Sequence, residues 1–138
     1  MNKGHTATLS IIFLGQRPSP GEVTELLNLP NPSDVFVIQR IIAADSIPVV
    51  LEFAYIPLPV SPITQEEIET HSLLELIPSK RHMILAKAIE SYTPAILTPD
   101  EADQLGVKAG HLAMRDQAII LDINLQPIYV SVALVRGD

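Results

Sequence analysis

Apolar and polar residues alternate along much of the chain, and this pattern predicts β-strands joined by turns and short helices. Six segments are rich in valine, isoleucine, leucine and tyrosine and are bounded by turn residues, which is typical of strands. These segments cover residues 6–15, 34–44, 48–57, 82–97, 112–123 and 127–136. The sequence therefore predicts six strands.

Helix starts are marked between these predicted strands. At four places a hydroxyl residue is followed three positions later by a glutamate, the spacing of a capping box, in which both side chains bind free amides at a helix start. The four boxes are Ser19–Glu22, Thr64–Glu67, Ser72–Glu75 and Thr98–Glu101. Two of them place a proline, Pro20 or Pro99, at the expected first helical position, where its missing amide costs nothing. We therefore expect four short helices.

Two connections between predicted strands are too short for a parallel crossover. The segments meet around Asp45–Ile47 and again around Asn124–Gln126, so both pairs are expected to form antiparallel hairpins. Helices inserted between strands without strict alternation indicate an α+β fold, with a six-stranded, mainly antiparallel sheet and short helices packed against it. A chain of 138 residues is the size of one domain, and we expect one over residues 1–138.

The loop of the first hairpin decides which side chains share a face of the sheet. A two-residue loop, Asp45–Ser46, would place Arg40 opposite Leu51. A loop one residue longer would place Arg40 opposite Glu52. Pro48 suits the first position of a strand, which favours the longer loop. We therefore predict that Arg40 and Glu52 share one face of the sheet.

Charge and composition narrow the possible partners. The net charge is -7, from 9 basic and 16 acidic residues, which repels phosphate backbones and argues against DNA binding by this chain alone. The absence of cysteine, of a long apolar run and of a signal peptide predicts a cytoplasmic protein without a membrane partner. Charged residues make up 18% of the chain, below the roughly 25% of ordinary domains, so we expect apolar surface to be covered in a homodimer.

Motifs for catalysis or metal binding are missing from the sequence. The four histidines, at positions 5, 71, 82 and 111, lack the spacing that brings two imidazoles to one metal, and we expect them to be exposed or to cap helices. There is no glycine-rich phosphate loop and no nucleophile elbow. Tyr92 and Tyr129 are expected in the core or in a pocket wall rather than as acid-base groups, because the pKa of an unshifted phenol lies far above neutrality. We expect no metal, no cofactor and no enzymatic activity.

Several short signatures occur in the order of a known family. The stretch "QRIIAADSIPVVLEFAYIPLP" resembles the Arg, Ala-Asp-Gly-x-Pro, Glu and Tyr-x-Pro series of the UTRA domain, the effector-binding half of GntR-type bacterial regulators of the HutC subfamily. "HSLLELI", "TPDEADQLGVKAGH" and "QPIYVSVALVRGD" resemble its later helices and last strand. The resemblance covers nearly the whole chain and implies a chorismate-lyase-like fold. It also implies that Arg136–Asp138 is the exit of the last strand rather than an adhesion motif.

The resemblance implies a regulatory mechanism. A small metabolite, such as a sugar or a sugar phosphate, would bind the domain and change the spacing of DNA-binding heads in a dimer. Such regulators carry a winged helix-turn-helix before this domain, and no basic helical segment precedes residues 6–15. DNA binding is therefore expected only through an N-terminal domain that this chain lacks. The effector must bind one dimer arrangement more tightly than the other, because equal affinity for both arrangements leaves their populations unchanged.

The family positions imply an effector site formed by Arg40, Glu52, Ser72 and Tyr129. A guanidinium binds an anion through a fork of donors, a glutamate accepts from hydroxyls, and a helix start presents free amides. The residues themselves also allow a simpler interpretation. Arg40 and Glu52 would then form only a cross-strand ion pair, and Ser72 would only cap its helix.

Two departures from the family pattern bear on the ligand. Ile42 replaces a second arginine and Leu74 replaces a tyrosine that sugar-phosphate-binding relatives tend to have. One charge-assisted contact is worth about 1.5–3 kcal/mol, so the effector is expected to be less charged, or more apolar, than a phosphosugar. Two alternatives stay open: a chorismate-lyase-like enzyme on the same fold, and a dimerisation module without a ligand.

Overall fold

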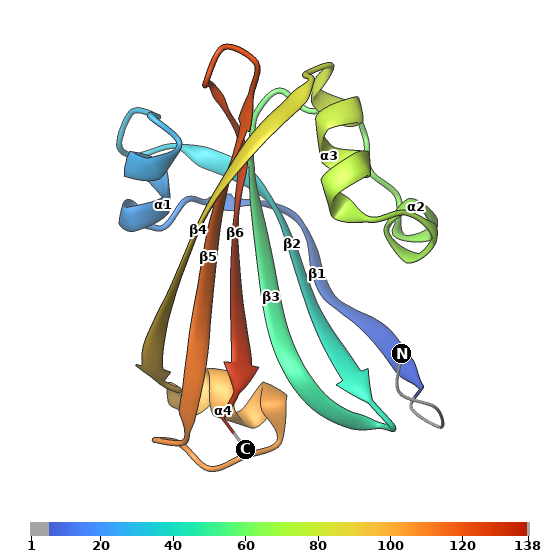
Figure 1. The fold of residues 1–138 in the computed structure, drawn as a ribbon, viewed down its shortest axis with the longest axis vertical. Helices are drawn as coiled ribbons and strands as arrows, with labels where there is room; N and C mark the ends of the chain where they lie inside the picture. The colour runs from blue at the N-terminus through green and yellow to red at the C-terminus, as the bar shows by residue number, and fades with distance from the viewer. Residues whose placement is uncertain (1–5, 138) are drawn as a thin grey trace.

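The computed structural model describes residues 6–137 and contains the six expected strands and four helices (Figure 1). In chain order the elements are β1 (Ala7–Pro18), α1 (Gly21–Leu26), β2 (Asp34–Ala44), β3 (Ile47–Pro57), α2 (Gln65–Thr70), α3 (Leu73–Arg81), β4 (Leu85–Ile96), α4 (Pro99–Leu105), β5 (Leu112–Asp122) and β6 (Pro127–Arg136).

All six strands form one sheet in the order β1-β2-β3-β6-β5-β4. Every neighbouring pair is antiparallel, so the predicted α+β class and both predicted hairpins are confirmed. The last strand, β6, lies in the middle of the sheet and joins the β2–β3 hairpin to the β5–β4 side. Residues far apart in the sequence are therefore neighbours at the centre of the sheet.

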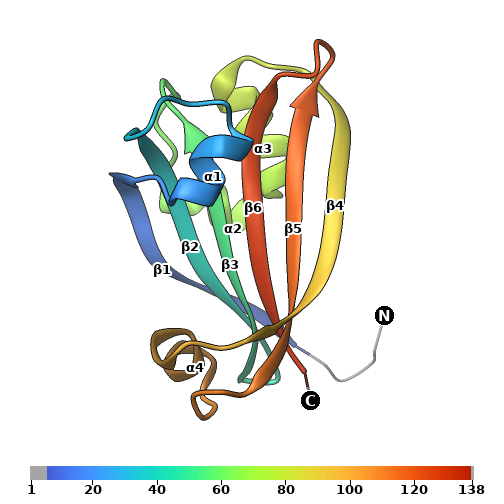
Figure 2. The same ribbon diagram turned by 90° about the vertical axis from the view of Figure 1, so that its left-hand side faces the viewer.

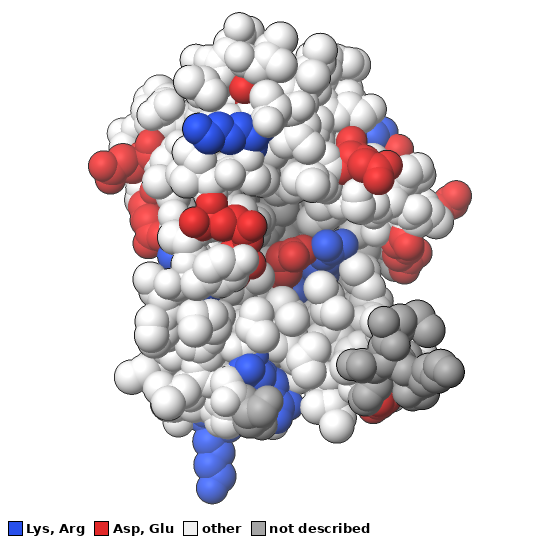
Figure 3. All heavy atoms as spheres, viewed as in Figure 1, with Lys and Arg blue, Asp and Glu red and all other residues white. Residues whose placement is uncertain are grey.

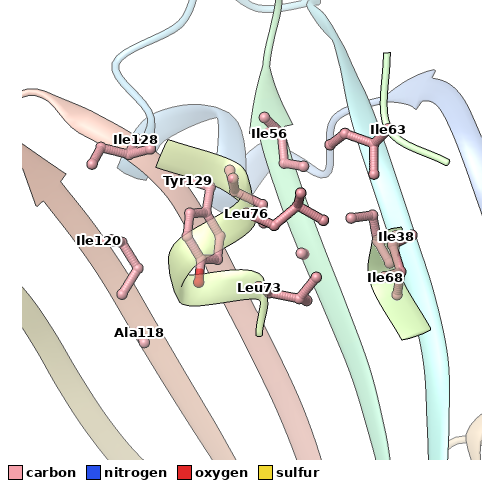
Figure 4. Close-up of a cluster of buried hydrophobic side chains, with 12 residues drawn as sticks. Ile38, Ile56, Ile63, Ile68, Leu73, Leu76, Ala118, Ile120, Ile128 and Tyr129 are labelled. Carbon is pink, nitrogen blue, oxygen red and sulfur yellow. The ribbon is translucent and has the colours of Figure 1, made fainter. Parts of the chain in front are cut away.

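The helices cover the two faces of the sheet differently. Helices α2 and α3 lie together over one face, which we call the front face (Figure 1). Helices α1 and α4 lie near opposite ends of the other face, the back face, as Figure 2 shows. The largest cluster of buried side chains fills the space between the front face and α2–α3 (Figure 4). Two smaller clusters lie under α1 and α4 on the back face.

The capping boxes explain where three of the helices begin. Thr64 and Thr98 form complete boxes with Glu67 and Glu101, and Ser72 accepts a hydrogen bond from the backbone amide three residues later.

No helix among the described residues is long enough to cross a membrane, since α3, the longest, has 9 residues.

The predicted box at Ser19 is wrong. Pro20 is the residue that precedes the first turn of α1, and proline has no side-chain oxygen to accept a hydrogen bond. The Ser19 hydroxyl therefore lies one position too early and donates to the Pro20 carbonyl instead. The Glu22 carboxylate forms an ion pair with Arg115. Pro20 thus lies before the first helical position, whereas Pro99 occupies it as predicted.

The β2–β3 turn differs from the predicted three-residue loop. It is a two-residue turn in which Asp45 and Ser46 both have positive φ, 51° and 68°, and Ala44 pairs with Ile47. Such turns match the twist of the strands that they join, and aspartate tolerates the left-handed conformation well. The local turn preference therefore outweighs the preference of a strand-initial proline.

A β-bulge nevertheless gives the predicted pairing. Beyond the turn the register shifts by one residue, because Val49 is passed over between the pairs Ala43–Pro48 and Ile42–Val50. An extra residue on one strand reverses which side chains face each other. Arg40 therefore lies directly opposite Glu52, as predicted, but the bulge and not the loop length is responsible.

The C-terminal tripeptide belongs to the fold as far as it is described. Arg136 ends β6 and donates to the backbone carbonyls of Pro48 and Leu105 at 3.0 and 3.4 Å. A side chain at Gly137 would lie only 2.8 Å from the Leu112 carbonyl oxygen. This confirms the predicted strand exit for these two residues, while Asp138 lies outside the described residues.

Three smaller predictions can be compared with the fold. His71 and His82 follow the last residues of α2 and α3, as expected for capping histidines, whereas His5 lies outside the described residues. Tyr92 was expected in the core or a pocket wall, and this is wrong. It is 61% exposed on β4, an edge strand with little cover, and its hydroxyl donates to Glu90.

Candidate functional site

A hollow of about 250 Å³ opens on the front face, between the central strands and the start of α3. We call it the front pocket. All four residues that the family resemblance implied lie in its wall. The lining residues are Arg40, Glu52, Ser72, Leu73, Leu74, Tyr129 and Ser131.

Arg40 and Glu52 form an ion pair at the base of the front pocket. The Arg40 Nε lies 2.6 Å from Glu52 Oε1, and the two side chains are 12% and 20% exposed. Acidic and basic atoms lie side by side in a recess of this face in Figure 3. The contact uses one of the five N–H donors of the guanidinium, so donors remain for a ligand. The ion pair of the simpler interpretation therefore exists within a hollow that can admit a ligand.

Tyr129 reaches the front pocket from β6 and is 4% exposed. Its side chain lies beside Leu73 and Leu76 of α3 in Figure 4. Burial raises the pKa of Tyr129 to about 12; the charge of Glu52 raises it further and that of Arg40 opposes this. At neutral pH the phenol is therefore a neutral hydrogen-bonding group.

The start of α3 forms part of the wall of the front pocket. The Ser72 hydroxyl accepts from the backbone amide of Glu75 at 3.3 Å, so its capping role is realised. Ser72, Leu73 and Leu74 all line the hollow, and Leu74 is 45% exposed. An aliphatic side chain thus stands in the wall where the family pattern has a tyrosine.

Between Arg40 and the β2–β3 turn, the front face is apolar. Ile42 points to the same face as Arg40, because the two residues are two positions apart on β2. It pairs with Val50, which in turn pairs with the exposed Val135 of β6. Among the described residues that line the front pocket, Arg40 is the one basic residue.

Ser131 and Asp116 are two polar residues of this region that the sequence interpretation missed. Ser131 lies two positions after Tyr129 on β6, so strand alternation would have found it. Asp116 pairs with Ala133, which pairs with Glu52, so it continues the same row across the sheet. Burial raises the pKa of Asp116, and the neighbouring carboxylates of Glu90 and Glu52 add to this. This row makes the surroundings of the pocket acidic.

A larger hollow, of about 490 Å³, lies beside α2 and α3 and away from the sheet. Several of its polar groups have structural partners: Lys80 contacts Glu67 at 2.7 Å, and His71 and His82 follow the last residues of their helices. Among residues 6–137 no group of three metal-binding side chains lies close enough to hold an ion. The front pocket is smaller, but all four residues that the family resemblance implied line it, and it is therefore the better candidate.

A single antiparallel sheet with helices on both faces and a lined hollow beside α3 defines a class of pocket-bearing α+β domains. Within that class this chain belongs to the UTRA domain family, whose model matches residues 2–138. A search of curated proteins gave no match.

Solved structures share the fold at low sequence identity. The ligand-binding domain of a protein assigned to the GntR family of regulators, from Bordetella bronchiseptica, is 22% identical, with a TM-score of 0.83 over 100% of this chain and 87% of that one. The effector domain of PhnF from Mycobacterium smegmatis is 21% identical, with a TM-score of 0.76 over 99% and 84%. The chain spans only 60% of a longer PhnF structure from the same organism.

Proposed function

We propose that this domain binds a small-molecule effector in the front pocket and thereby controls a GntR-type transcription regulator. The observation that carries the proposal is the convergence of Arg40, Glu52, Ser72 and Tyr129 on one hollow. These residues come from β2, β3, the start of α3 and β6, so only the folded sheet brings them together.

The chemistry of the front pocket favours a hydroxylated ligand with at most one anionic group. Its one guanidinium is already paired with Glu52, so an incoming dianion would meet one half-neutralised cation. The neutral phenol of Tyr129 and the hydroxyls of Ser72 and Ser131 suit hydroxyl groups of a ligand. Leu73 and Leu74 add an apolar wall. Sugars and hydroxy acids therefore fit better than sugar phosphates.

Signal transmission in this proposal requires a homodimer. Large apolar side chains are exposed along β4, β5 and β6, including Ile96, Leu112 and Met114, and a second copy would cover them. The effector acts by favouring one arrangement of the two copies. DNA is then contacted by a winged-helix domain that precedes this one in a cytoplasmic regulator, and not by this acidic domain itself.

We propose a binding role rather than a catalytic one. A general acid or base works best with a pKa near neutrality. Burial raises the pKa of Tyr129 to about 12, far from neutrality, and the Glu52 carboxylate is engaged by Arg40. A chorismate lyase assay distinguishes the alternative, because turnover of chorismate would replace this proposal.

A thermal-shift screen tests the proposal directly. Neutral hexoses, hexose phosphates and hydroxy acids are each added to the domain, and a true effector raises its melting temperature by mass action. The double variant Arg40→Ala/Glu52→Ala should remove this response without leaving an unpaired charge in the pocket. Lys108→Ala, outside the front pocket, is the matched control and should respond like the wild type. An equal response of the double variant would contradict the proposed site.

A further inference from the structure

A second hollow lies on the back face and shares no residue with the front pocket. It has a volume of about 310 Å³, within the range of small-molecule sites. We call it the back groove. Its lining comes from α1, β3, β4, α4, β5 and β6, and its wall includes Glu22, Ala95, Glu101 and Arg115.

The floor of the back groove is aromatic and aliphatic. Phe53 and Tyr55 alternate on β3, and their rings lie nearly parallel, at 8°, with centroids 6.0 Å apart. Val132 and Leu134 continue the floor on β6. Helices α1 and α4 lie near opposite ends of the back face (Figure 2), and residues of both helices line the groove. This mainly apolar and aromatic floor suits an aromatic ring.

One cationic side chain, Arg115, lies in the wall of the back groove as described. Its Nη1 donates to Gln117 Oε1 at 3.0 Å, and its Nη2 lies 2.7 Å from Glu22 Oε1. These contacts use two of five donors. The Glu22 side chain is 59% exposed, so its ion pair with Arg115 contributes little and a ligand carboxylate can replace it.

Three charged side chains line the back groove, and the cationic one, Arg115, is the group that can take an anion. The Tyr55 hydroxyl has no hydrogen-bond partner among residues 6–137. Burial raises its pKa, and the positive charges of Arg115 and Arg17 lower it. The carboxylates of Glu101 and Glu22 raise it by smaller amounts. Arg17 is fixed 3.4 Å above the Phe13 ring centroid. One Glu101 oxygen accepts the Thr98 amide at 2.9 Å in its capping box, so this carboxylate is already bound.

We propose that the back groove is a second ligand site, which takes a small aromatic carboxylate. The ring lies on Phe53, Tyr55 and Val132, and the carboxylate replaces Glu22 at the Arg115 guanidinium. The Tyr55 hydroxyl offers a further donor to the ligand. This site goes beyond the proposed front pocket and does not depend on it.

The test uses three naphthalene probes of equal size: 2-naphthoate, 2-naphthylmethanol and 2-naphthylmethylammonium. The chain has no tryptophan, so naphthalene fluorescence can be followed with little protein background. The wild type should bind the carboxylate at least tenfold more tightly than either the alcohol or the ammonium, because neither of these can form a charge-assisted contact with the Arg115 guanidinium.

Four variants locate the probe. Arg115→Gln should weaken naphthoate binding at least tenfold and leave the alcohol unchanged. Glu22→Gln should strengthen naphthoate binding several-fold, because it removes the competing carboxylate. Ala95→Phe should fill the groove without adding an indole fluorophore, and should abolish binding of all three probes. Arg40→Gln, in the front pocket, should change none of them.

Each other outcome overturns the inference. No binding to the wild type would mean that the groove is closed or covered by another copy of the chain. Equal affinity for the carboxylate and the alcohol would show simple apolar adsorption. Loss of binding in Arg40→Gln but not in Arg115→Gln would place the probe in the front pocket. A weakened Glu22→Gln variant would show that Glu22 positions Arg115 rather than competing for it.

Discussion

The front and back faces of this sheet are made by the same strands, yet they carry different hollows. On the front face α2 and α3 lie together, and the front pocket opens beside them over Arg40 and Glu52. On the back face α1 and α4 are separated, and the back groove lies between them over Phe53 and Tyr55. Strand alternation decides which residues each face presents. The placement of short helices decides which of these residues stay accessible.

The largest expected effects come from removing the packing under each face. Ile77 of α3 and Leu105 of α4 are both fully buried, on the front and back side respectively. Changing either to alanine should lower the free energy of unfolding by about 2–5 kcal/mol, because a cavity replaces packed atoms. Urea denaturation measures this, with the half-exposed Leu74→Ala as the control on α3. A change below about 1 kcal/mol on one side only would mean that the two faces do not depend equally on their helices.

A smaller loss is expected when the ion pair of the front pocket is broken. Arg40→Ala leaves Glu52 without its partner at a position that is 20% exposed, which should cost about 1–3 kcal/mol. The double variant with Glu52→Ala should be more stable than this single variant, since no unpaired charge remains. Arg115→Ala, which breaks the more exposed pair on the back face, should cost less than about 1 kcal/mol. Equal costs in both pairs would remove this difference between the faces.

The helix caps allow a comparison within the back face. Thr98→Ala should destabilise the domain by about 1 kcal/mol, because it removes the acceptor for the Glu101 amide at the start of α4. Ser19→Ala should have less effect, since Ser19 makes no cap bond to α1. Thermal denaturation of both variants measures the difference. A Ser19 cost as large as that of Thr98 would show that α1 has a capping interaction after all.

The smallest effect concerns a pH-dependent contact at α2. A hydrogen bond from Lys80, with the Thr64 amide, lowers the pKa of Glu67 from 4.5 to about 2. A depressed folded-state pKa stabilises the domain above the unfolded value, and this contribution disappears as pH falls through about 2. Glu67→Gln should therefore lower stability at pH 7 but not near pH 2. The exposed Glu66→Gln is the control. A stability difference that persists unchanged near pH 2 would contradict the ionic origin.

Much of the fold follows from local signals in the sequence. Strand alternation, short connections and three capping boxes predicted the six strands, their antiparallel hairpins and three helix starts. The β2–β3 hairpin shows the limit of such signals. A two-residue turn and a bulge at Val49 have the same net effect on Arg40 and Glu52 as the predicted longer loop. Pairing alone therefore did not reveal the local geometry.

The candidate sites depended on different kinds of information. Arg40, Glu52, Ser72 and Tyr129 came from the resemblance to the UTRA family, because nothing local in the sequence brings four separate elements together. The back groove had no such guide. It depends on the spacing of α1 and α4 across the sheet, and on Phe53 and Tyr55 being left uncovered between them. Tertiary packing of that kind is not encoded in any one segment.

The most direct test of the central claim is amide chemical-shift mapping by NMR with a compound that stabilises the domain in the thermal-shift screen. Binding in the front pocket predicts the largest shifts at Leu73, Tyr129 and Ser131, with loss of these shifts in the Arg40→Ala/Glu52→Ala double variant. Largest shifts at His71 and Lys80, in the hollow beside α2 and α3, would contradict the proposed effector site.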